Sequence, residues 1–144
     1  MLYLVKSECE VEESTQIGVL DTSVIIDLDR LDSKSLPPVV AVPTIALAEL
    51  AAGVHATDDP VVRAERMNRL HKVSLQFEPL PFDEAASQQY GTMVAHVIAA
   101  GRNPRPRRMD LLIAATAGSH RLPLYTRNPN DFIGLEKAVS VIAV

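Results

Sequence analysis

The stretch Ile17-Gly-Val-Leu-Asp21-Thr-Ser-Val-Ile-Ile-Asp27 decides the fold of this chain. Its first four residues form a short apolar run that predicts a buried strand, and the apolar spacing over residues 24–31 predicts a helix. Asp21 stands between the two, at the carboxyl end of the strand. Ligand sites of open α/β sheets form beyond the carboxyl ends of the strands. Asp21 is therefore a candidate functional residue, although Asp is equally suited to cap the helix.

Strands and helices alternate along the rest of the chain. Further strands are predicted at residues 39–42, 76–80, 124–126 and 139–143. Helices are predicted at 44–54, 61–73 and 109–119, and a longer one from an N-cap at Asp83 to Gly101. Two prolines keep the basic loop 102–108 from being helical, and 128–132 has the composition of a polar turn. The pattern predicts an α/β fold whose mostly parallel central sheet is covered by helices on both faces.

Composition limits the classes of function. With 144 residues, 47% of them hydrophobic, the chain has the size of a single domain. Its net charge of −4 gives no overall attraction to nucleic acid, so a polyanion would have to meet a local basic patch. Cys9 is the only cysteine, which excludes an internal disulfide or a cysteine zinc site and suits the cytoplasm. The most apolar stretch, 39–54, is too short to span a membrane, so no membrane partner is expected.

Glu49 is the strongest candidate on the residues alone. It is the only Asp, Glu, Lys or Arg between Lys34 and Asp58, in a predicted helix of Ala, Leu and Ile. Burying an ionised carboxylate without a partner is costly, so the group must be protonated, paired with a base or bound to a cation. No base lies nearby in the sequence. The alternative is a glutamate at the helix edge whose carboxylate reaches water.

Other oxygen donors follow later in the chain. Asp110 begins the helix 109–119, where an acid stabilises the helix dipole by about 0.3–1 kcal/mol, so its position alone does not indicate function. Asn128 and Asp131 follow the strand 124–126, in a stretch that also has ordinary turn composition. Ser23 and Thr126 could hydrogen-bond metal-bound waters or serve the structure only.

These candidates are all oxygen donors, without His or Cys. Such a set selects hard cations, Mg²⁺ or Mn²⁺, rather than Zn²⁺. Mg²⁺ held by acidic side chains and water activates a water molecule and neutralises charge on a phosphoryl group. The chemistry therefore favours hydrolysis of a phosphodiester bond.

Four motifs occur in order along the chain: Val19-Leu-Asp21-Thr-Ser-Val-Ile-Ile-Asp27, Ala48-Glu49-Leu50, Asp110-Leu-Leu-Ile-Ala-Ala-Thr-Ala117 and Leu124-Tyr-Thr126-Arg-Asn128-Pro-Asn-Asp131-Phe132. Together they resemble the PIN-domain family, most closely the VapC-type ribonuclease toxins of bacterial VapBC toxin–antitoxin pairs. The resemblance implies a three-layer α/β/α domain over residues 17–144. Residues 1–16 depart from the family as an acidic N-terminal extension, which is either a misassigned start or an added element.

The resemblance also implies a site and an activity. Asp21, Glu49 and Asp110 would hold Mg²⁺ or Mn²⁺, with Asp131 completing the acidic site. Some family members have an acid where this chain has Asn128, so the choice of Asn128 or Asp131 as fourth site residue stays open. The family implies an endoribonuclease that forms a homodimer and binds a cognate VapB-type antitoxin.

Arg107 and Arg108 are candidate substrate-binding residues. They end the basic loop 102–108, directly before Asp110, so their guanidinium groups could bring RNA phosphates to the metal. An acidic protein that acts on RNA needs cations near its site, which favours this role over a merely solvated loop. The alternative is that the same arginines bind an acidic segment of a partner protein.

Other functions fit the motifs less well. Phosphatases of the haloacid-dehalogenase type also have an aspartate after the first strand, but they use a second acid two residues later, where this chain has Ser23. An inactive PIN fold that binds RNA or protein as a regulator would require loss of the acids, which are present. A DNA target or a housekeeping role in RNA processing stays open, because the preference for an RNA-cleaving toxin comes from the family.

Overall fold

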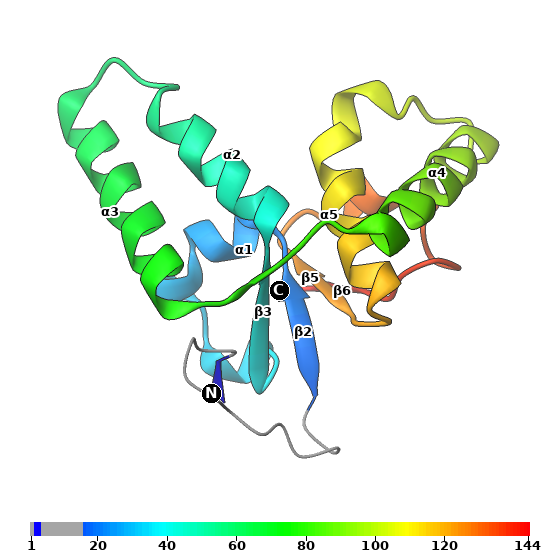
Figure 1. Ribbon diagram of the computed structural model, residues 1–144, viewed down its shortest axis with the longest axis horizontal. Coiled ribbons are helices and arrows are strands. Elements are labelled where there is room, and N and C mark those ends of the chain that lie inside the picture. Colours follow the sequence, from blue (N-terminus) through cyan, green and yellow to red (C-terminus); the bar gives the residue numbers. More distant parts are fainter. Residues whose placement is uncertain (1, 4–15) are drawn as a thin grey trace.

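A parallel β-sheet forms the centre of the computed structural model, which describes residues 2–3 and 16–144 (Figure 1). Within these residues the order across the sheet is β1-β3-β2-β5-β6, and β4 pairs with the end of β3. Each of these pairings is parallel. The strands are β1 (Leu2–Tyr3), β2 (Ile17–Leu20), β3 (Val39–Pro43), β4 (Pro79–Leu80), β5 (Leu124–Thr126) and β6 (Val141–Ala143).

Helices cover the sheet and complete the predicted three-layer α/β/α arrangement. Figure 1 shows α2 and α3 packed together toward one end of the long axis and α4 and α5 toward the other. None of the helices in the described part of the chain is long and apolar enough to cross a membrane. The α-helices are α1 (Thr22–Ile26), α2 (Thr44–Val54), α3 (Pro60–Gln76), α4 (Glu84–Ala99) and α5 (Arg108–Ser119), and the 3-10 helices are η1 (Leu28–Arg30), η2 (Ser33–Ser35), η3 (Arg105–Arg107) and η4 (Pro129–Phe132).

The core is built mainly from aliphatic residues, with Phe77 and Phe132 among its largest buried side chains. The central strands are buried as nearly continuous apolar runs, as expected for a parallel sheet with both faces covered. The helix α5 adds a run of small buried side chains, which lets its backbone lie close to α4 and β3. Completely buried core residues include Val19, Leu20, Val40, Ala41, Val42, Met93, Leu111, Ile113, Ala114, Ala115, Ala117 and Leu124.

Most predicted elements are confirmed with shifted ends. The helix 44–54 and the strand 124–126 are found as predicted, and Asp83 caps α4 by accepting a hydrogen bond from the backbone N–H of Ala86. Gly101 follows α4 with a φ of 74°, the left-handed conformation that glycine permits after a helix. The closing strand is shorter than predicted and covers Val141–Ala143 only.

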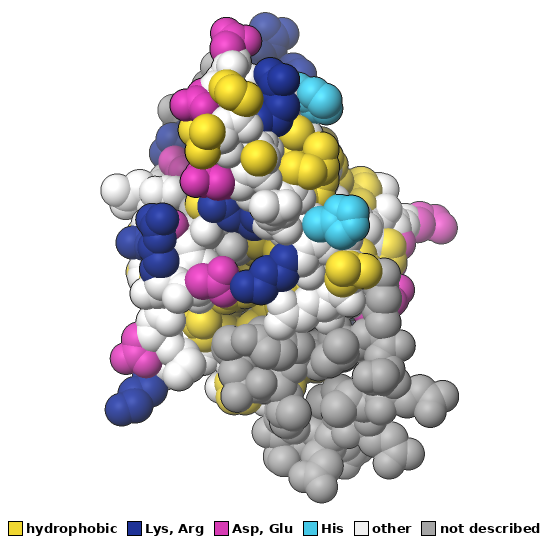
Figure 2. Space-filling view, turned by 90° about the vertical axis from the view of Figure 1, so that its left-hand side faces the viewer, with side chains coloured by type: hydrophobic (Ala, Val, Ile, Leu, Met, Phe, Trp, Pro, Cys, Tyr) yellow, Lys and Arg dark blue, Asp and Glu magenta, His cyan; other side chains and the backbone are white. Residues whose placement is uncertain are grey.

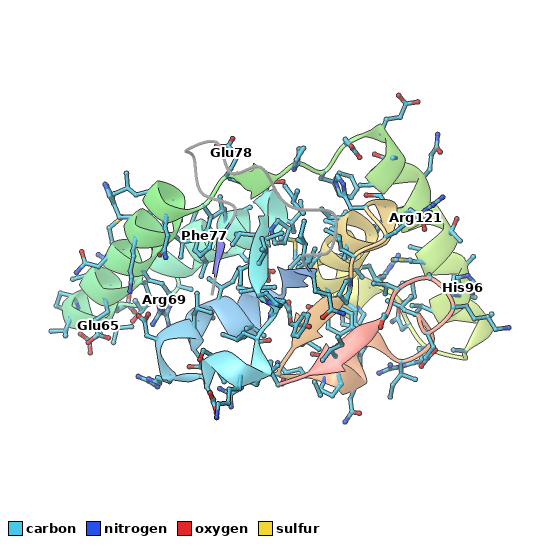
Figure 3. All side chains as sticks on the ribbon, turned by 90° about the horizontal axis from the view of Figure 1, so that it is seen from below. Glu65, Arg69, Phe77, Glu78, His96 and Arg121 are labelled. Carbon is cyan, nitrogen blue, oxygen red and sulfur yellow. The ribbon has the colours of Figure 1, made fainter. Side chains whose placement is uncertain are left out.

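The predicted strand 76–80 is largely wrong. Helix α3 continues to Gln76, and the backbone N–H of Phe77 still donates to the carbonyl of Val73. Phe77, labelled in Figure 3, is 1% exposed, so its aromatic side chain anchors the end of the helix in the core. Only Pro79 and Leu80 remain for pairing with β3. The burial of Phe77 decides where α3 ends. From the sequence pattern alone, this burial looked the same as that of a strand residue.

Local hydrogen bonding divides other predicted segments. The predicted helix 24–31 is interrupted at Asp27, where the 3-10 turn η1 begins with a bond from the N–H of Arg30 to the Asp27 carbonyl. The loop 102–108 contains the 3-10 turn η3, because prolines are compatible with the first positions of a helical turn. The predicted turn 128–132 is the 3-10 turn η4.

The N-terminal extension is described only in part. Leu2 and Tyr3 pair in parallel with Val39 and Val40 of β3. Residues 1 and 4–15, including Cys9, lie outside the described residues. The division into an extension over 1–16 and a domain over 17–144 therefore stays a prediction.

Gly18 in β2 provides a test of the packing between strands. A Cβ at this position would lie 2.5 Å from Cε2 of Tyr125 and 2.7 Å from Cγ of Pro37, both in rigid rings. We expect Gly18→Ala to destabilise the protein by about 1–3 kcal/mol through overpacking, measured by urea denaturation. The control is Gly91→Ala in α4, where nothing lies within 4 Å of the new Cβ. The control should be stabilised by about 0.5–1 kcal/mol, and equal effects of the two substitutions would contradict this packing.

Candidate active site

The predicted site residues gather at the carboxyl edge of the sheet. Asp21 follows β2, and Thr126 ends the neighbouring strand β5. Glu49 lies on α2, which follows β3 directly, and Asp110 lies in the first turn of α5. The charges of Asp21, Asp131 and Glu49 all act on the Asp110 carboxyl. The fold therefore brings together acids that are up to 110 residues apart in sequence.

Asp21 is 4% exposed and is held by three donors. Its Oδ1 accepts from the backbone N–H of Thr22 at 2.8 Å, which makes Asp21 the N-cap of α1. Its Oδ2 accepts from the hydroxyls of Ser23 at 2.9 Å and Thr126 at 2.8 Å. Asp21 therefore caps the helix, and its carboxylate is held in one orientation. Its Oδ1 accepts only one hydrogen bond, so this oxygen can still bind a cation.

Ser23 and Thr126 therefore act on Asp21 directly. The two hydroxyl oxygens are 3.5 Å apart, and each also accepts a backbone N–H, from Arg127 and Asn128 respectively. Thr126 is completely buried. Because both acceptors are occupied by N–H groups, the hydroxyl hydrogens are directed to the carboxylate. The pair fixes the orientation of Asp21.

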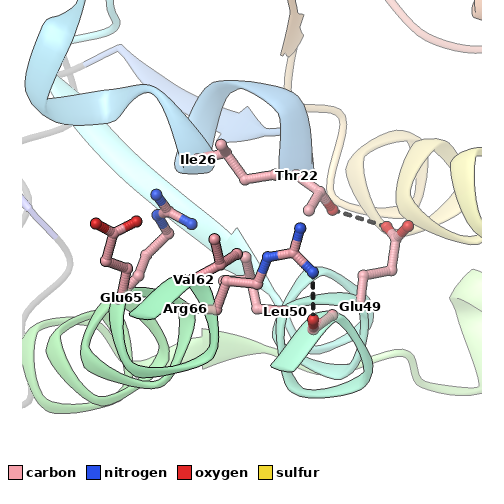
Figure 4. A pocket seen from close by; sticks show the side chains of 9 residues that line it. Thr22, Ile26, Glu49, Leu50, Val62, Glu65 and Arg66 are labelled. Atoms are coloured by element: carbon pink, nitrogen blue, oxygen red, sulfur yellow. Dashed lines mark hydrogen bonds between the residues drawn. The ribbon is translucent and has the colours of Figure 1, made fainter. Parts of the chain in front are cut away.

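Glu49 is half-buried, and its Oε1 accepts from the Thr22 hydroxyl at 2.7 Å (Figure 4). Burial raises the pKa of Glu49, the Thr22 hydrogen bond opposes this, and the charge of Asp21 raises the pKa further. Among the described residues no Lys, Arg or His forms an ion pair with Glu49. Arg66, which lines the same pocket of about 480 Å³, donates instead to the carbonyl of Gly53 at 2.7 Å.

Asp110 carries the clearest electrostatic signature. Burial and then the charges of Asp21, Asp131 and Glu49 raise its pKa from 3.8 to about 7, against the opposing charge of Arg107. Arg107 therefore offsets only part of the repulsion among the like charges around Asp110. A cation bound beside such a carboxyl would favour its charged form.

The donor set fits a hydrated divalent cation. Asp21, Glu49 and Asp110 offer only carboxylate oxygens, the ligands that Mg²⁺ and Mn²⁺ prefer. In residues 2–3 and 16–144, no three His, Cys, Asp or Glu side chains are close enough to form a complete ligand set. Mg²⁺ does not require one, because it retains several waters and is usually held by one or two carboxylates.

The remaining candidates lie at the rim of this cluster. Asp131 in η4 pairs with Arg107, with 2.9 Å between Oδ1 and Nη1. Asn128 is exposed, and its contact with the site is a backbone hydrogen bond to the Thr126 hydroxyl at 3.0 Å. Arg108 is exposed at the first residue of α5. The charge of Asp131 acts on the Asp110 carboxyl, whereas Asn128 is linked to the site through its backbone.

Sequence reasoning missed three contributors to the site, namely Thr22, Asp27 and Arg127. The Thr22 hydroxyl binds Glu49, and Asp27 binds Nη1 of Arg127 at 2.7 Å. The ion pair ties the end of α1 to the residue after β5, across 100 positions of sequence. Thr22 and Asp27 stand in the quoted motif, but nothing in their spacing indicated these partners.

An all-oxygen acidic cluster at the carboxyl edge of a parallel sheet defines a class of α/β domains that bind hydrated metal ions. Comparison with known proteins narrows the class. The model of the PIN domain family matches residues 18–137. Ribonuclease VapC5 of Mycobacterium tuberculosis is 40% identical over 127 residues, which cover 86% of this chain and 91% of that protein. Ribonuclease VapC4 of the same organism is 32% identical over 130 residues, 88% and 96% of the two chains.

Solved structures agree. The crystal structure of VapBC-5, a member of the VapBC family of toxin–antitoxin systems from Mycobacterium tuberculosis, matches with a TM-score of 0.78 and 38% identity, covering 89% of this chain and 98% of that chain. FitAcB from Neisseria gonorrhoeae matches with a TM-score of 0.65 and 27% identity, covering 88% and 96%. The chain therefore belongs to the PIN-domain family, among its VapC proteins.

The raised pKa of Asp110 predicts a pH-dependent stability of the metal-free protein. Between about pH 4 and pH 7 the folded state keeps a proton that the unfolded state has lost, so this contribution is complete at low pH and disappears as pH rises through about 7. We expect Asp110→Asn to remove much of the resulting decrease in melting temperature, measured in EDTA. The exposed Asp29, paired with Lys72, provides the control Asp29→Asn. If the melting temperature of Asp110→Asn depended on pH as that of the wild type does, the raised pKa of Asp110 would be refuted.

Proposed function

We propose that this protein is a Mg²⁺- or Mn²⁺-dependent endoribonuclease and the toxin of a toxin–antitoxin pair. The observation that carries the proposal is the group of carboxylates at the carboxyl edge of the sheet, where burial and then the charges of the neighbouring acids raise the pKa of Asp110 to about 7. Relatives that are 40% and 32% identical over most of the chain are named ribonucleases, which supports RNA as the substrate.

Asp21, Glu49 and Asp110 would hold the cation. When bound, it would supply an activated water and neutralise charge on the phosphodiester. Ser23 and Thr126 keep Asp21 in one orientation, and Thr22 does the same for Glu49. Asp110 must lose its proton to bind the cation, so metal affinity should increase as pH rises through about 7.

The arginines at the rim would attract the substrate. Arg107 and Arg108 precede Asp110 directly, where η3 ends and α5 begins. Guanidinium groups bind phosphate through two parallel hydrogen bonds, and positive charge beside the acids offsets their repulsion of RNA. We therefore propose both residues as substrate-binding groups, acting on RNA in the cytoplasm.

A VapB-type antitoxin and a second copy of the chain are the proposed protein partners. The structure that matches with 38% identity is a member of the VapBC family of toxin–antitoxin systems. Exposed apolar side chains along α3 offer area for such contacts, because Val61, Met67 and Leu75 are 64%, 44% and 70% exposed. Figure 2 views the molecule from this side, where hydrophobic side chains lie among Lys and Arg.

The central test of the activity is Asp21→Asn on structured and single-stranded RNAs. The wild type should cleave with Mg²⁺ and not with EDTA, and the variant should lose at least about 100-fold in rate because a ligand charge is removed. Asp29→Asn, an exposed aspartate outside the cluster, is the matched control and should cleave normally. Cleavage by Asp21→Asn at the wild-type rate would refute the proposal, and absence of Mn²⁺ binding by the wild type would favour a binding-only protein.

Thr126→Val tests the support of Asp21. Valine keeps the shape of threonine but removes the hydrogen bond of 2.8 Å to Oδ2. Groups that orient a metal ligand typically contribute 10–100-fold to metal affinity or activity, so we expect Mn²⁺ affinity and cleavage to fall by about tenfold or more. Thr92→Val on the exposed side of α4 is the control, since Thr92 bonds only a carbonyl of its own helix. Wild-type Mn²⁺ affinity in Thr126→Val would exclude this orienting role.

A further inference from the structure

Arg107 and Asp131 form an ion pair beside the acidic cluster, between η3 and η4. The distance from Nη1 to Oδ1 is 2.9 Å, and the two side chains are 24% and 42% exposed. Nη1 of Arg107 also lies 3.5 Å from the carbonyl of Asn130. The pair is therefore partly shielded from solvent and is supported by a backbone contact.

A second arginine holds the same turn. Nη1 of Arg102 donates to the carbonyls of Asn130 at 2.9 Å and Ile133 at 3.2 Å. The loop 102–108 is thus joined to η4 at both of its ends, by Arg102 and by Arg107. Such cross-links restrict the movement of Asp131 relative to Arg107.

Asp131 differs from the other acids of the site in its partner. Asp21 and Glu49 accept hydrogen bonds from hydroxyl and N–H groups, and within residues 2–3 and 16–144 no ion pair involves either of them or Asp110. Asp131 alone among these four acids already has a cation, Arg107. A metal that bound Asp131 would share its carboxylate with this guanidinium, which already balances the charge of Asp131, whereas the other three carboxylates have no such partner among the described residues.

Arg107 retains free donors while it is paired. Within the described residues only Nη1 of its guanidinium takes part in hydrogen bonds, so the N–H groups on Nε and Nη2 are available. The charge of Arg107 also reaches Asp110 and lowers its pKa. A guanidinium with free donors next to the proposed metal ligands is suited to a phosphate group.

We propose that Asp131 is a positioning residue for Arg107 rather than a metal ligand, and that Arg107 so held binds a phosphate of the RNA beside the bond that is cut. This inference rests on the proposed function. Asp131 is then the fourth acid of the site but does not bind the cation. Arg107 makes the electrostatic contact with the substrate.

Mn²⁺ titration without RNA tests the first half of the inference. Asp131→Asn should keep the Mn²⁺ affinity within about twofold of wild type, whereas Asp110→Asn should lower it at least about tenfold. Asp29→Asn, which breaks another ion pair away from the acids, is the control for a general effect of charge. A loss in Asp131→Asn equal to that in Asp110→Asn would overturn the inference, because Asp131 would then bind the metal.

Binding of a short mixed-sequence RNA in EDTA tests the second half. Arg107→Gln and Asp131→Asn should each weaken RNA binding, Arg107→Gln by about tenfold with a shallower salt dependence. The double variant should bind no more weakly than Arg107→Gln, because Asp131 acts through the arginine. Additive losses, or wild-type RNA binding by Asp131→Asn, would overturn the positioning role.

Failure of the proposed function would look different. If Asp21→Asn and Asp110→Asn both retained wild-type Mn²⁺ affinity, the metal site itself would be wrong, whatever the behaviour of Asp131. If those variants lost Mn²⁺ while Asp131→Asn weakened neither Mn²⁺ nor RNA binding, the metal site would stand and only the role of Asp131 would fall. Melting temperatures of all variants, measured in parallel, identify any loss that comes from unfolding.

Discussion

The burial of one carboxylate, that of Asp21, constrains the whole carboxyl edge of the sheet. A buried acid must be given hydrogen bonds, and here they come from the first turn of α1 and from the end of β5. Those donors are in place only if β2 and β5 are adjacent and parallel, as the pairing of Leu20 with Tyr125 ensures. The order of the central strands and the geometry of the site are therefore linked through the same side chain.

This arrangement places several carboxylates close enough to repel one another. Asp110 and Glu49 have raised pKa values because they are partly buried near other acids, and neither has a basic partner among the described residues. The metal-free fold tolerates this through protonation and through the hydroxyl of Thr22. A cation would remove the same repulsion, so metal binding at this site would be coupled to folding stability.

Three arginines place positive charge around the rim of the acidic site. Arg127 joins α1 to the loop after β5 through Asp27, and Arg102 and Arg107 join the loop before α5 to η4. Each of these contacts connects segments that are far apart in sequence. The protein has a net charge of −4, so these arginines provide local positive charge beside the acids.

The sequence by itself determined the class of the fold and predicted the acids that the structure brings together. Alternating apolar runs and amphipathic segments require a helix-covered parallel sheet, and Glu49 in an apolar helix already indicated a carboxylate that needs a partner. Local patterns could not reveal the partners, because the bonds of Thr126 to Asp21 and of Thr22 to Glu49 span 105 and 27 residues. They also could not separate Asp131 from the other acids. Only the tertiary structure, which pairs Arg107 with Asp131 and gives Asp110 no ion pair among the described residues, decided that difference, since electrostatic interactions depend on distance in space and not along the chain.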